Sequence, residues 1–163
     1  MLSEITSRSV FTALIAAFFI HNIEEAITIC RFQVENPFPF IQPASCNQFV
    51  VAVSIVSAAG LSAFTVSVQT KNINVYNFIS TGLAAALFFN VLIPHLLVAI
   101  YTLHYTPGLV SALLLNLPLS LLVMIKNRPY YTSRNKFLKH ISVFLIIGYI
   151  LFAMSMGMAK ILV

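Results

Sequence analysis

Three ionisable side chains lie close together in "HNIEE", residues 21–25, directly after the apolar run VFTALIAAFFI. On a helix with about 100° between residues, His21 and Glu25 are about 40° apart around the axis, and Glu24 is about 60° away on the other side of His21. The three side chains therefore share one helix face, whereas Asn22 points elsewhere. This face holds two of the four acidic residues of the chain.

Burying these groups in a bilayer is unfavourable. On insertion scales a charged side chain at the helix centre costs about 2.5–3.5 kcal/mol. Ionisable groups inside a membrane are therefore functional candidates that require partners. The third apolar segment supplies Asn90 and His95 in "FFNVLIPHLL", and we expect them at the depth of HNIEE. Pro94 leaves the carbonyl of Asn90 without its helical hydrogen bond, which predicts a kink there.

The first chemistry that fits is a metal site. A histidine and a carboxylate four residues apart can bind one cation from one helix face, and H-x-x-E-E is similar to the inverted zinc motif H-x-x-E-H. On this analogy His21, Glu25 and His95 are the metal ligands and Glu24 is the general base, with Asn90 orienting the site. Two histidines and a carboxylate with an open position suit zinc or non-haem iron.

Three alternatives remain open. Adjacent carboxylates beside a histidine could form a metal-free acid–base pair in an isomerase-like enzyme. The same carboxylates could relay protons in a transporter. In a structural subunit, Glu24 or Glu25 would only clamp helices through hydrogen bonds to His95 or Asn90. The inner halves of the first and third apolar segments contain only Asn, Ser and Thr as polar groups, which favours an enzyme over a conduit.

The segments that must position these residues are transmembrane helices. The chain has 163 residues, of which 60% are hydrophobic and 8% charged, against about 25% charged in soluble domains. A spanning helix needs about 20 mostly apolar residues. We expect an all-α, polytopic transmembrane bundle that forms a single domain of about five spans, with the third kinked at Pro94. The predicted spans are approximately 10–30, 48–69, 75–103, 108–125 and 140–162.

The basic residues predict the orientation of this bundle. If the N-terminus is cytoplasmic and the C-terminus outside, seven of the nine cations lie inside and only Arg31 and Lys160 lie outside, as the positive-inside rule requires. We therefore expect a bacterial inner (cytoplasmic) membrane protein whose site faces the outer leaflet and a lipid-like substrate. The cations fall between apolar runs, so the net charge of +5 does not indicate a nucleic-acid partner. The oligomeric state is left open.

Residues of two outer loops have assignments that depend on tertiary structure. Cys30 and Cys46 flank a proline-rich loop and either form a disulfide or remain free thiols. His104 and Tyr105 precede a Pro-Gly turn signal in "YTLHYTPG". Interfacial Tyr and His usually anchor helices, so we rank these two as supporting residues around the ligands rather than as ligands.

Taken in order, these motifs resemble the HXXEE family of small bacterial membrane proteins. The resemblance covers roughly residues 10–125 and rests on HNIEE, on Asn90 and His95 in "NVLIPH", and on "YTPG". It implies a multi-span protein with enzymatic or metal-dependent activity. In the family's second motif the asparagine and histidine are four residues apart, whereas here they are five apart. An extra residue in the turn at Pro94 would restore their geometry.

Overall fold

Five helices of the computed structural model are long and apolar enough to cross a membrane. The structure describes residues 2–31 and 45–163, with side chains from Ser7 onward. The first two candidate spans are α1 (Leu2–Thr28) and α2 (Cys46–Gln69), and the last is α7 (Arg134–Leu162). The third comprises α3 (Ile73–Asn90), the π-helical segment η1 (Val91–Leu96) and α4 (Leu97–Thr102). The fourth comprises α5 (Leu109–Ser111), the π-helical segment η2 (Ala112–Asn116), α6 (Leu117–Asn127) and the short 3₁₀ turn η3 (Arg128–Tyr130).

The predicted all-α bundle of five apolar helices is therefore confirmed, and it indicates a membrane protein. The helices extend further than the apolar runs. α7 begins at Arg134, because the hydroxyl of Ser133 accepts a hydrogen bond from the backbone N–H of Lys136 at 3.2 Å. Hydropathy locates the apolar part of a helix, whereas its end depends on capping.

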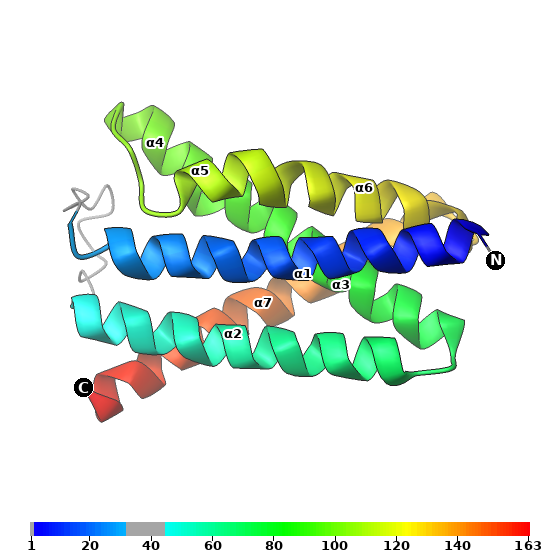
Figure 1. Ribbon diagram of the computed structural model, residues 1–163, viewed down its shortest axis with the longest axis horizontal. Helices are drawn as coiled ribbons and strands as arrows, with labels where there is room; N and C mark the ends of the chain where they lie inside the picture. Colours follow the sequence, from blue (N-terminus) through cyan, green and yellow to red (C-terminus); the bar gives the residue numbers. More distant parts are fainter. Residues whose placement is uncertain (1, 32–44) are drawn as a thin grey trace.

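The helices form one bundle in which α1 packs between α2 and the third and fourth spans. The long helices run along the same general axis (Figure 1). The N-terminus lies at one end, with the α2–α3 turn and the end of α6. The end of α1, the start of α2, the turn between α4 and α5 and the C-terminus lie at the other. We call these the N-terminal end and the site end.

The predicted kink in the third span is present. Ile93 has non-helical backbone angles (φ −137°, ψ 110°), and the Ile93–Pro94 peptide is cis. The backbone hydrogen bonds around it are π-helical, which adds a residue to the turn. This segment directly follows Asn90 and contains His95.

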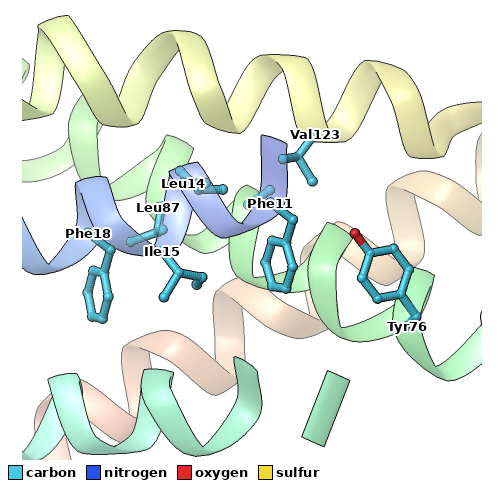
Figure 2. Packing of buried hydrophobic residues seen from close by; sticks show 8 residues of the cluster. Phe11, Leu14, Ile15, Phe18, Tyr76, Leu87 and Val123 are labelled. Atoms are coloured by element: carbon cyan, nitrogen blue, oxygen red, sulfur yellow. The ribbon is translucent and has the colours of Figure 1, made fainter. Parts of the chain in front are cut away.

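The apolar core lies between the two ends of the bundle. Phe11, Leu14 and Phe18 of α1 pack there with Tyr76 of α3 and Val123 of α6 (Figure 2). Phe11 and Leu14 have no exposed surface, and the rings of Phe11 and Tyr76 meet edge to face. Phe11 and Leu14 are two to three turns along α1 from His21, so this packed layer lies on the N-terminal side of the polar site.

The contact between α3 and α7 can be tested at Gly82. A Cβ atom built there would lie 2.2 Å from the Phe144 ring, so we expect Gly82→Ala to destabilise the bundle by about 1–3 kcal/mol through overpacking. Gly157→Ala is the matched control, because nothing lies within 4 Å of its Cβ position. Thermal unfolding in detergent measures both variants. Equal midpoints for the two would contradict this packing.

Candidate metal centre

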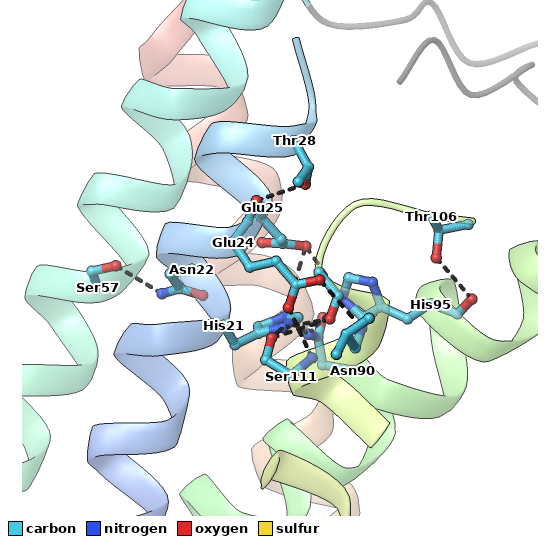
Figure 3. A network of polar contacts seen from close by, with 12 residues as sticks. His21, Asn22, Glu24, Glu25, Thr28, Ser57, Asn90, His95, Thr106 and Ser111 are labelled. Atoms are coloured by element: carbon cyan, nitrogen blue, oxygen red, sulfur yellow. Dashed lines mark hydrogen bonds and ion pairs between the residues drawn. The ribbon is translucent and has the colours of Figure 1, made fainter. Parts of the chain in front are cut away.

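His21 and Glu25 of the first span and His95 of the third span converge at the site end (Figure 3). Oε1 of Glu25 lies 3.2 Å from Nε2 of His95 and 3.8 Å from Nε2 of His21. The two imidazole rings meet edge to face with centroids 4.6 Å apart. One ligand atom from each of the three residues lies within 4.8 Å of the others, so the cluster is geometrically compatible with a metal ion. His21 is 1% exposed, His95 3% and Glu25 13%.

The hydrogen bonds of Nδ1 determine which ring nitrogen of His21 carries the proton. Nδ1 lies 3.1 Å from the carbonyl oxygen of Gly108 and 3.2 Å from Oγ of Ser111. Because a carbonyl can only accept, Nδ1 carries the proton and donates it. The lone pair of Nε2 then faces Glu25 and Asn90. Metal-binding histidines use the same arrangement, in which a second hydrogen bond fixes the tautomer and the ring.

Asn90 lies between the two histidines, and its role as an orienting residue stays a prediction. Its Nδ2 is 3.3 Å from Nε2 of His21 and 3.3 Å from Nε2 of His95. In a regular α-helix, residues five apart point about 140° away from each other. The π-helical turn at Val91–Leu96 takes up the extra residue, so Asn90 and His95 face the same point. The predicted effect of the five-residue spacing is thus confirmed.

Glu24 contacts the turn between the third and fourth spans. Its Oε2 accepts a hydrogen bond from the backbone N–H of Ser111 at 2.8 Å. Its Oε1 accepts from the Tyr105 hydroxyl at 2.5 Å and from the backbone N–H of Val110 at 3.3 Å. These are N–H groups of the first helical turn, where a carboxylate is favourable. Glu24 therefore anchors the start of the fourth span to α1, and its role as general base stays a prediction.

The two supporting candidates have different surroundings. Tyr105 reaches the site through its hydrogen bond to Glu24. Burial, together with this bond, raises the pKa of the Tyr105 phenol above its usual value, so at neutral pH the hydroxyl stays protonated and donates. His104 is exposed, and its Nδ1 lies 2.5 Å from the carbonyl oxygen of Thr102. The structure does not bring His104 into the cluster.

Sequence reasoning assigned no contact with this site to three residues. Ser111 and Gly108 hold His21, and the hydroxyl of Thr106 donates to the carbonyl oxygen of His95 at 3.2 Å. Thr106 is 4% exposed. Thr106 and Gly108 belong to the YTPG motif, whose Pro-Gly pair indicates a turn, whereas Ser111 has no such signal in the sequence.

Cys30 and Cys46 form a disulfide, with their Cα atoms 5.4 Å apart. The bond joins the chain just after α1 to the first residue of α2. At the site end, α1 and α2 are therefore covalently linked, five residues beyond Glu25.

The backbone of Gly108 lies close against the cluster. Its φ is +79°, and an added Cβ would lie 2.6 Å from Cγ of Glu25 and 2.7 Å from Cε1 of His21. A left-handed backbone favours glycine, and here no side chain has room.

We therefore expect Gly108→Ala to displace the turn and to lower the unfolding midpoint in detergent, by more than Gly148→Ala does. At Gly148 a Cβ would meet only Ala86, at an ordinary 3.6 Å. Strain at such a position is worth about 1–3 kcal/mol. Unchanged stability of the Gly108 variant would contradict the tight packing of the turn on His21 and Glu25.

Comparison with known proteins places this site within a family. A family model described as "Protein of unknown function with HXXEE motif" matches residues 12–123. The chain is similar to "Uncharacterized protein YrkK" of Bacillus subtilis (strain 168), with 33% identity over 109 residues, which are 66% of this chain and 68% of that protein. No solved structure matches the chain. The matched region contains all the clustered residues, and the chain belongs to the HXXEE family.

Proposed function

We propose that this protein is a membrane-embedded, metal-dependent enzyme, hydrolase-like, that acts on a lipid-like substrate from the outer leaflet. One observation carries the proposal. The Nε2 atoms of two buried histidines and one carboxylate oxygen converge from two spans, and the proton of His21 is held on its opposite nitrogen by Gly108. A helix clamp needs one hydrogen bond between spans and no such convergence of acceptors.

The donor set supports zinc or non-haem iron. Both metals accept two imidazoles and one carboxylate and keep a position open for water or substrate. Such an ion would act as a Lewis acid and make bound water a nucleophile at neutral pH. Asn90, 3.3 Å from both Nε2 atoms, is placed to hold a water molecule or substrate oxygen at the open position.

The surroundings of the cluster support a substrate from the lipid phase. Large apolar side chains are exposed on α1 and on the third span near the cluster, among them Ile20, Ile23 and Leu97. The turn that contains the buried residues Thr106 and Gly108 lies against the cluster and limits access from water. A bilayer molecule that diffuses laterally meets the apolar faces first.

Glu24 remains our proposed general base. Its carboxylate is near the cluster but accepts three hydrogen bonds from the turn. To take a proton from a nucleophile, it would exchange one of these bonds for the nucleophile. Tyr105 is the most suitable to leave, because its hydroxyl can rotate away whereas the backbone N–H groups cannot.

A proton conduit is the weaker candidate. Asn116, Ser120 and Asn127 form a fully buried polar stripe along the fourth span. The apolar side chains of Leu14 and Val123 pack between the site and the N-terminal end. Within the described residues, this layer supports a site open towards one leaflet.

The proposed orientation has the N-terminus in the cytoplasm and the C-terminus outside. The disulfide supports it, because it lies at the site end, which would face the oxidising compartment. We expect alkaline phosphatase fused after Val163 to be active in bacterial cells and the same enzyme fused after Lys71 to be inactive. The reverse pattern would invert the topology and place the site in the inner leaflet.

The metal site is tested by metal analysis of detergent-purified protein. We expect about one zinc or iron per chain in the wild-type protein. In His21→Ala and His95→Ala the affinity for the metal should fall by more than the roughly 10–100-fold that is typical when a hydrogen-bond partner of a ligand is removed. His104→Ala is the matched control, because its ring lies in an exposed turn. If folded wild-type protein contains no metal even after zinc and iron are added back, the metal-dependent mechanism is wrong and the metal-free acid–base mechanism remains.

The variant Glu24→Gln tests the proposed general base independently of the proposed metal ligands. This variant should keep the metal but lower kcat by about 10²- to 10⁴-fold, measured as hydrolysis of a panel of short-chain phospholipids and acyl esters. Unchanged turnover in Glu24→Gln would remove the base assignment while leaving the metal site intact.

A further inference from the structure

The N-terminal end of the bundle contains a cavity that is separate from the candidate metal centre. A cavity of about 150 Å³ is lined there by Asn74, Asn77, Phe78, Tyr130 and Tyr131. At about 30 Å³ per molecule, this is the volume of roughly five waters. The lining joins the first turns of α3 to the turn that follows α6. None of these residues contributes to the metal centre.

Among the lining residues, Asn77 has a buried side chain whose polar atoms lack partners in the described part of the chain. Asn77 is 4% exposed, and neither its Oδ1 nor its Nδ2 has a hydrogen-bond partner among the described side chains and backbone. A buried amide without partners costs about 1–3 kcal/mol, so native structures usually pair such groups. A ligand in the cavity that both accepts and donates hydrogen bonds, or brings water, would satisfy Asn77.

Positively charged groups around the cavity favour an anionic ligand. Arg128 donates to the backbone carbonyl of Tyr131 at 3.2 Å and lies over the Phe137 ring, which fixes a guanidinium beside the lining. Lys71 and Arg134 are exposed on neighbouring turns. Asn74 and Asn77 lie near the N-terminus of α3, whose backbone N–H groups favour negative charge.

The Tyr131 hydroxyl adds a neutral donor to the lining. It makes a long hydrogen bond, 3.5 Å, to the carbonyl oxygen of Asn77 and also interacts with the Thr81 side chain. Burial raises the pKa of this phenol above its ordinary value, so the hydroxyl stays protonated at neutral pH. Phe78 and Tyr130 are 49% and 46% exposed, and exposed aromatic rings at the end of a span suit the headgroup level of a bilayer.

We propose that this cavity binds a phosphate group, carried by an anionic phospholipid of the leaflet at this end. The Asn77 amide and the Tyr131 hydroxyl donate to the phosphate oxygens, Arg128 and the α3 N-terminus balance their charge, and the exposed rings contact the glycerol and upper acyl chain. Free inorganic phosphate offers the same chemistry without the apolar part.

Native mass spectrometry of the full chain in detergent tests this site. We expect dioleoylphosphatidylglycerol to bind more tightly than dioleoylphosphatidylcholine. Asn77→Asp keeps the side-chain shape and adds a negative charge, so phosphatidylglycerol affinity should fall about fivefold, the effect of one charge near the surface. Asn135→Asp is the matched control, because Asn135 is an exposed asparagine at the start of α7 and does not line the cavity.

The outcomes are distinguishable. Asn74→Asp, at an exposed lining position, replaces Asn77→Asp if the latter does not fold. Displacement of the lipid by inorganic phosphate at equal concentration would support the phosphate site and make free phosphate its ligand, whereas retained lipid would support the headgroup. Equal binding of the two lipids, or equal losses in the lining and control variants, would overturn the proposal.

Discussion

The carboxylate of Glu24 ties the fourth span to the first. It accepts hydrogen bonds from two backbone N–H groups and one tyrosine hydroxyl of the turn after the third span. Those N–H groups belong to a helix start and would otherwise lack partners. Once this turn is held, the Gly108 carbonyl and Ser111 lie beside His21 and fix its ring. The hydrogen bonds of the half-buried Glu24 carboxylate therefore help to orient His21 in the candidate metal centre.

Irregular helical turns position the other residues of the candidate site. The third and fourth spans each contain a π-helical segment at the level of the site, and the two segments pack against each other. The first brings His95 onto the same face as Asn90. Such turns lose regular hydrogen bonds, which a membrane tolerates only where protein buries them. Each segment turns one face into the bundle, with Val91 and His95 buried in the first and Ala112 and Asn116 in the second, whereas Ile93 and Leu114 are exposed.

The two ends of the bundle are chemically different. The site end carries the buried histidines, two glutamates and a disulfide. The N-terminal end carries seven of the nine basic residues and a cavity lined by amides and tyrosines. The apolar layer around Phe11 and Leu14 separates them. The two proposed sites are therefore at opposite ends of the bundle, with packed apolar side chains between them.

The sequence by itself determined the class of the protein, because no water-facing surface can be built from 8% charged residues. It also located His21, Glu25, Asn90 and His95, since ionisable and amide groups stand out in apolar runs and helical periodicity places them on a face. Only the tertiary structure decided what Glu24 contacts, because its partners are backbone N–H groups 86 and 87 positions away along the chain. Backbone donors are the same for every residue type, so no residue pattern identifies them. The exclusion of His104 and the pairing of Cys30 with Cys46 were decided in the same way, by where the folded turns place these side chains.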